Sequence, residues 1–173
     1  MNPAVDGDGR PTRRLAAMAA WQPDCYQRAI AYVTDPVGRL LVFEHVDVDA
    51  GTQVPGGGIH VGESAEDAVL RELAEESGVD SAVVVRKLGE AWNRSEPGKV
   101  PEGLEEQIQH AFHLRLDGPP QHERWEWAET SGSDVVGHRF ALRWIALDEA
   151  ELVLWPSQAM WIDPVRVSLR HPA

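Results

Sequence analysis

The stretch PGGGIHVGESAEDAVLRELAEESGV, residues 55–79, constrains the fold of this 173-residue chain more than any other. Ser64, followed three residues later by Asp67, fits a helix N-cap, and Gly78 stands where a left-handed C-terminal cap belongs. Apolar residues at helical spacing form a stripe between these caps, namely Val69, Leu70, Leu73 and Ala74. The stretch therefore predicts a capped helix that packs this stripe onto the rest of the fold.

Alternating or β-branched runs surround this helix and predict six strands. They cover residues 26–35, 38–46, 81–94, 105–116, 123–129 and 138–147. Residues 148–169 have a helical pattern on either side of Pro156. We therefore expect an α/β fold, with a single domain over residues 25–173 that ends in a helical segment. Residues 1–24 begin with many Gly, Pro and Asp residues and are expected to form a partly disordered arm.

The charge and cysteine content exclude several classes of function. The chain has 28 acidic and 16 basic side chains, a formal net charge of −12, which argues against nucleic acid as a bulk partner. A small anion can still bind where a metal ion or a few arginines reverse the local potential. Cys25 is the single cysteine, so no intramolecular disulfide is expected and a cytoplasmic location is predicted. No apolar run is long enough to span a bilayer, so no membrane partner is expected.

The predicted helix carries an unusual cluster of negative charge. Glu72, Glu75 and Glu76 fall within an arc of roughly 100° on an ideal helix. Like charges at this spacing repel, and the macrodipole disfavours anions toward the C-terminal end. A solvated acidic face is the plain alternative. A divalent cation such as Mg²⁺ or Mn²⁺ would compensate the repulsion, and the preceding glycines would let backbone groups approach an ion or a phosphate closely.

The same stretch resembles the signature of the Nudix hydrolases: a Gly, five residues, a Glu, seven residues, then Arg-Glu-apolar-any-Glu-Glu-any-Gly-apolar. This sequence matches it at every position, with Gly57, Glu63, Arg71, Glu72, Leu73, Glu75, Glu76, Gly78 and Val79. The predicted strands extend the resemblance to about residues 25–160. The resemblance implies an α/β/α sandwich with a mixed β-sheet. It also implies metal-assisted hydrolysis of a nucleoside diphosphate derivative by attack of water on phosphorus.

The resemblance also implies roles for individual residues. Glu75 and Glu76 are expected to bind metal, Glu72 to act as a ligand or a base, and the Gly56 carbonyl to be a further ligand. Arg71 is expected to orient the neighbouring carboxylates. The candidate catalytic residues of the motif are therefore Arg71, Glu72 and Glu76.

Residues outside the motif supply a candidate general base. Among Glu102, Glu105 and Glu106, we favour Glu105, because polar residues alternate with it along the strand at 105–116. These residues are Gln107, Gln109 and His113, and we expect their face to look toward solvent or a ligand. His110 and His113 are an odd number of residues apart, which places them on opposite faces and argues against a metal-binding pair.

Candidate substrate-binding residues also lie outside the carboxylate cluster. His60, in the glycine loop, could reach a phosphate, and Arg94 is a further candidate. Trp127 could stack a base, as could Trp92 and Trp125, although core packing is the default for each tryptophan.

The substrate of such an enzyme is open among nucleoside triphosphates, nucleotide sugars and ADP-ribose. Residues downstream of the motif mark subfamilies: Pro97 lies a little late for the proline of ADP-ribose pyrophosphatases, and no tyrosine follows Tyr32, which disfavours diadenosine polyphosphates. The alternative is a non-catalytic module that senses a nucleotide. The expected partner is a small nucleotide-like diphosphate, and a homodimer is a candidate assembly.

Overall fold

The computed structural model describes residues 26–94, 105–129 and 138–171. The expected arm at residues 1–24 lies outside these ranges, as do Pro97 and Glu102. Within the described ranges, no helix is long and apolar enough to cross a membrane.

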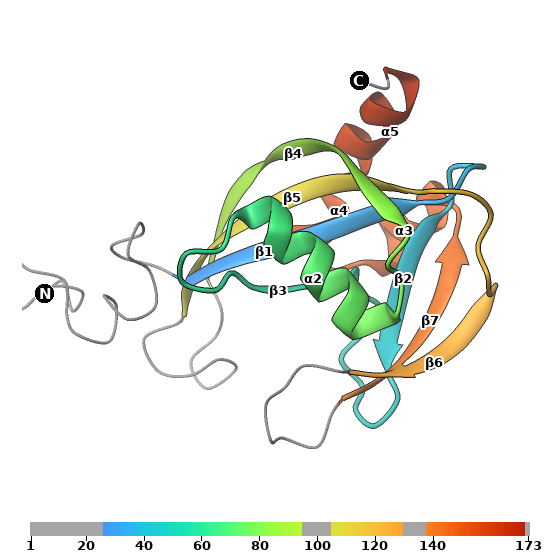
Figure 1. Ribbon diagram of the computed structural model, residues 1–173, viewed down its shortest axis with the longest axis horizontal. Helices are drawn as coiled ribbons and strands as arrows, with labels where there is room; N and C mark the ends of the chain where they lie inside the picture. The colour runs from blue at the N-terminus through green and yellow to red at the C-terminus, as the bar shows by residue number, and fades with distance from the viewer. Residues whose placement is uncertain (1–25, 95–104, 130–137, 172–173) are drawn as a thin grey trace, which may run out of the picture.

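One mixed β-sheet forms the centre of the fold (Figure 1). Its main strands are β1 (Tyr26–Thr34), β2 (Leu40–His45), β4 (Ala82–Arg94), β5 (Glu106–Leu116), β6 (Arg124–Ala128) and β7 (Arg139–Ile145), in the order β4-β5-β1-β2-β7-β6. β1 and β5 are parallel, and the other neighbours are antiparallel. All six predicted strands are confirmed, each within two residues of its predicted ends.

A seventh strand, β3 (Gly56–Gly58), pairs with β1 and was missed by the sequence analysis. The glycine run reads as a loop, because glycine is depleted in strands. Pairing with β1 supplies the order that the local sequence lacks, since Ala29 lies opposite Gly57 in the ladder.

Helices cover both faces of the sheet (Figure 1). α2 (Ala65–Ser77) lies on one face, and α3 (Leu147–Val153), α4 (Pro156–Ala159) and α5 (Ile162–Arg170) lie on the other. The strand β1 contributes side chains to the cores on both faces of the sheet. Ala31 packs in the core under α2, and Tyr32 packs in the core under the C-terminal helices. The expected α/β/α sandwich with a mixed sheet is confirmed.

The helix α2 has the predicted ends but a different buried side. The Ser64 Oγ accepts a hydrogen bond from the Asp67 N–H at 3.0 Å, and Gly78 ends the helix with a φ of 73°. The predicted apolar stripe is wrong at Leu70, which is 37% exposed, whereas Glu72 is only 8% exposed. The helix is rotated in this way because Glu72 packs over Gly57, which leaves space for a carboxylate.

The expectation that one face of β5 opens to solvent or a ligand is wrong. Gln107, Gln109 and His113 are all buried. The helix α5 covers His113, whose Nδ1 lies 2.7 Å from the Ser168 Oγ and whose Nε2 lies 2.9 Å from the Thr34 Oγ1. His110 instead pairs with a glutamine of β1, so the two histidines occupy separate environments.

Candidate active site

Side chains, not another strand, occupy the free edge of β3. A Glu76 carboxylate oxygen accepts a hydrogen bond from the Gly56 N–H at 2.8 Å. The Gly56 carbonyl accepts one from Arg28 at 2.6 Å, and the Gly58 carbonyl accepts one from Arg71 at 2.7 Å. Edge strands carry unpaired backbone groups that need partners. Here those partners are the charged side chains of α2 and β1, which ties the acidic helix directly to the glycine strand.

Gly57 is required by the close approach of Glu72. A Cβ atom added at Gly57 would lie 2.2 Å from a carboxylate oxygen of Glu72. The glycine in the first position of the motif therefore leaves the space in which the Glu72 carboxylate lies.

Arg71 connects three of the motif carboxylates. Its guanidinium donates to both Glu63 oxygens, at 2.8 and 2.9 Å. It also donates to Glu72 at 2.7 Å and to Glu75 at 3.1 Å. Glu63 in turn accepts from the His60 N–H at 2.9 Å, which links the loop to the helix. This geometry suits an arginine that orients carboxylates, and its role in turnover stays a prediction.

The site concentrates more negative charge than its arginines balance. Burial raises the pKa of Glu76 to about 8, against the lowering effect of the Gly56 N–H, and the nearby Glu72 raises it further. Burial also raises the pKa of Glu72, although Arg71 opposes this. Arg71 lowers the pKa of Glu63, which lies on the outer side of the cluster. A cation bound beside Glu72 and Glu76 would relieve the excess charge.

The chemistry of these groups fits a hard divalent cation, but their arrangement must change to bind one. Carboxylate and carbonyl oxygens are the ligands that Mg²⁺ and Mn²⁺ take. Within the described ranges, however, no three His, Cys, Asp or Glu side chains are grouped so that they could hold a metal ion. Arg71 and the Gly56 N–H occupy carboxylate oxygens, and Arg28 occupies the Gly56 carbonyl. Because a carbonyl oxygen has two lone pairs, an ion at the Gly56 carbonyl would either share it with Arg28 or displace Arg28.

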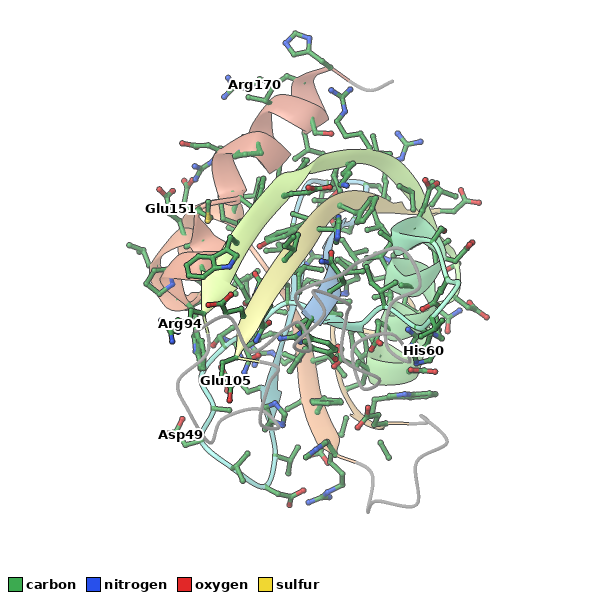
Figure 2. The ribbon with its side chains drawn as sticks, turned by 90° about the vertical axis from the view of Figure 1, so that its left-hand side faces the viewer. Asp49, His60, Arg94, Glu105, Glu151 and Arg170 are labelled. Atoms are coloured by element: carbon green, nitrogen blue, oxygen red, sulfur yellow. The ribbon has the colours of Figure 1, made fainter. Side chains whose placement is uncertain are left out.

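The predicted residues outside the motif are divided between two places. Figure 2 shows His60 beside α2, and Arg94 and Glu105 together at the ends of β4 and β5, apart from it. Arg94 lies opposite Glu106 in the ladder of these two strands. The structure thus brings Arg94 and Glu105 to the same strand ends and His60 to the motif. A general-base role for Glu105 and substrate binding by Arg94 stay predictions.

Trp127, the third predicted substrate-binding residue, packs against the end of α2. Its indole N–H donates to the Glu75 carbonyl at 3.0 Å. Its ring faces Gly78, where an added Cβ would lie 2.7 Å from the ring. The side chain is partly buried, and stacking on a base stays a prediction.

Two charged residues near the cluster were missed by the sequence analysis. Arg28 lies on β1 and lowers the pKa of both Glu72 and Glu76. Arg28 directly precedes the apolar run AIAYV, and a charged residue at this place in a strand was a signal that could have found it. Glu129, directly after β6, is close enough to raise the pKa of Glu76. No local signal marks Glu129, because its position depends on the pairing of β6 with β7.

Two relatives support the resemblance seen in the motif. The RNA pyrophosphohydrolase of Campylobacter jejuni subsp. doylei is 36% identical over 81 residues, which cover 45% of this chain and 52% of that protein. The RNA pyrophosphohydrolase of Gluconacetobacter diazotrophicus is 32% identical over 129 residues, which cover 60% of this chain and 77% of that protein. The chain thus spans about half the length of the first relative and about three quarters of the second.

Solved structures share the fold. The E. coli dihydroneopterin triphosphate pyrophosphohydrolase matches with a TM-score of 0.63 and 17% identity, over 79% of this chain and 92% of that one. A model of the NUDIX domain matches residues 26–163, well over half of the sequence. The chain therefore belongs to the Nudix family.

Proposed function

We propose that the protein is a Mg²⁺- or Mn²⁺-dependent pyrophosphohydrolase that cleaves the diphosphate linkage of a nucleoside diphosphate derivative. The observation that carries this proposal is the gathering of the motif carboxylates at the edge of β3, where Arg71 contacts Glu72 and Glu75 and the Gly56 N–H contacts Glu76. In the proposed active state, Glu72, Glu75, Glu76 and the Gly56 carbonyl would hold the ion.

Each side chain has a task in this reaction. The ion would neutralise the diphosphate and make a bound water more acidic. Arg71 keeps Glu72 and Glu75 in place, and either Glu72 or the predicted external base Glu105 accepts the proton of the attacking water. Arg28, once it leaves the Gly56 carbonyl, is positioned to contact a phosphate oxygen, for which a guanidinium is well suited.

The substrate class follows from the names of the relatives and from the charge of the chain. RNA pyrophosphohydrolases and dihydroneopterin triphosphate pyrophosphohydrolase both act, by name, on a phosphoanhydride attached to an organic group. The net charge of −12 disfavours a long contact with an RNA backbone. We therefore place small nucleotides first: nucleoside triphosphates, nucleotide sugars and ADP-ribose.

A nucleotide-sensing module without turnover is the second candidate. One observation favours it: among the described residues, no three His, Cys, Asp or Glu side chains are grouped so that they could hold a metal ion. Such a protein would bind a nucleotide and release no phosphate product. The predicted cytoplasmic location and homodimer are compatible with either function and stay predictions.

A panel assay separates the two candidates. Purified protein with Mg²⁺ or Mn²⁺ is offered nucleoside triphosphates, ADP-ribose, nucleotide sugars and a short 5′-triphosphorylated RNA, and products are separated by chromatography. Glu76→Gln should abolish turnover. Glu66→Gln, a matched change at an exposed position in the first turn of the same helix, should leave turnover intact. Stoichiometric nucleotide binding without any product would favour the sensing module.

A further inference from the structure

A cavity lies at the C-terminal end of α2, outside the carboxylate cluster. It has a volume of about 390 Å³ and is bounded by Gly78, by the β5–β6 connection and by the rings of Trp125, Trp127 and Trp144. This volume is within the range of small-molecule sites. None of Glu72, Glu75 and Glu76 lines it. Of the residues predicted to take part in hydrolysis or substrate binding, only Trp125 and Trp127 line the cavity, which is therefore separate from the carboxylate cluster.

The three tryptophans form fixed walls. Each indole N–H already donates to a backbone carbonyl: Trp125 to Ser77 at 2.9 Å, Trp127 to Glu75 at 3.0 Å and Trp144 to His122 at 3.2 Å. The polar edge of each ring is thus used within the fold. Trp125 and Trp127 are partly buried and Trp144 is 8% exposed, so only part of each ring faces the cavity, held in place before any ligand arrives.

Three acidic side chains and one histidine, His122, are the ionisable groups that line the cavity. Asp80, Asp117 and Glu126 line it, and no lysine or arginine does so among the described residues. Glu126 lies 3.7 Å from Arg139, a contact between two largely exposed side chains. Neither Asp80 nor Asp117 forms an ion pair with another described residue. The C-terminal end of α2 adds the partial negative charge of its backbone carbonyls.

We propose that this cavity binds a small organic cation, with a quaternary ammonium group held against the tryptophan rings. Ring faces attract cations through their quadrupole, and the carboxylates and the helix end act in the same direction. The same charges repel phosphate, so the cavity is a site distinct from the one proposed for the diphosphate.

The test compares choline with 3,3-dimethylbutan-1-ol, the neutral isostere that has carbon in place of nitrogen. Nitrogen-15 spectra follow the indole N–H signals of the seven tryptophans during each titration. Choline should shift the signals of Trp125, Trp127 and Trp144 in a saturable manner and leave exposed Trp155 unchanged. The neutral isostere should bind about tenfold more weakly.

Charge variants locate the site without changing the tryptophans. The double change Asp80→Asn with Asp117→Asn should weaken choline binding roughly threefold. Asp49→Asn, an exposed aspartate that does not line this cavity, should leave binding unchanged. Equal binding of choline and its isostere, the same affinity in the double variant, or no shift of these three signals with choline would each overturn the proposal.

Discussion

Two buried polar clusters lie on opposite faces of the sheet and are built in opposite ways. Under α2, Glu72 and Glu76 share a confined site in which burial raises both pKa values. Under α5, His113 is neutral and contacts the hydroxyls of Thr34 and Ser168. The first cluster retains charge that a ligand could neutralise, and the second is complete within the fold. The comparison suggests that the first cluster serves function and the second serves stability.

The strongest way to break this comparison is to remove one carboxyl group from the first cluster. Glu76→Gln should lower turnover by about 10²-fold or more, because it removes a proposed metal ligand. It should not lower the free energy of unfolding, since the amide oxygen can still accept from the Gly56 N–H and burial no longer opposes a charge. Turnover and urea denaturation of the same preparation measure both effects. A stability loss as large as the activity loss would contradict the functional role.

The second cluster should affect stability and not turnover, and its contribution to the free energy of unfolding should depend on pH. Burial lowers the pKa of His113 to about 4, assisted by Arg86 and Arg115, whereas the unfolded chain keeps the ordinary value near 6.5. The unfolded state therefore binds more protons between these values, so stability is full above about pH 6.5 and falls as the pH drops toward 4. The shift corresponds to about 3 kcal/mol.

Because other groups titrate in the same range, the difference between proteins isolates this effect. Urea denaturation from pH 7 to pH 4 should show a steeper loss in the natural sequence than in His113→Gln. His122→Gln, a matched change at an exposed histidine, should behave like the natural sequence. Parallel curves for all three proteins would show that the protonation of His113 does not contribute to the pH dependence of stability.

A third change tests how tightly the first cluster is packed. Gly57→Ala should lower the free energy of unfolding by about 1–3 kcal/mol and reduce turnover, because the new Cβ overlaps the Glu72 carboxylate. Gly62→Ala is the control: its φ of 82° adds backbone strain, but the space around it is open. Thermal unfolding of the two variants separates overlap from strain. Equal turnover in both would mean that Glu72 does not need its position over β3.

The smallest effect is expected at Arg28. If this side chain contacts a phosphate in the active state, Arg28→Lys should raise KM about threefold to tenfold while kcat changes less, since lysine keeps the charge and loses the bidentate geometry. Steady-state kinetics on the substrate found in the panel assay measure this. A fall in kcat with no change in KM would place Arg28 in the chemical step instead.

Local patterns in the sequence account for most of the elements, and contacts distant in the sequence account for what was missed. Ser64 and Gly78 mark the ends of α2 because caps depend on neighbouring residues. The burial of His113 depends on Ser168, 55 residues away, so the alternation along β5 could not reveal it. The strand β3 likewise exists through its pairing with β1.

The same distinction applies to the candidate site. The spacing of the motif brings Arg71 and Glu75 together, because residues four apart are neighbours on a helix. The contact of Arg71 with the adjacent Glu72 does not follow from this spacing. The choice of Glu105 rested on a strand face that proved to be covered, and Figure 2 shows this residue apart from His60. Arg28 contacts the Gly56 carbonyl across 28 residues of sequence, so its position beside an apolar run was visible locally but its partner was not.

Direct measurement of Mn²⁺ binding tests the central claim, that the carboxylates at the edge of β3 form a divalent-cation site. Electron paramagnetic resonance reports free Mn²⁺ during titration of the natural sequence, Glu76→Gln and Glu66→Gln. The account predicts saturable binding to the natural sequence and to Glu66→Gln, weakened at least about tenfold in Glu76→Gln. Equal Mn²⁺ affinity in all three proteins would contradict it.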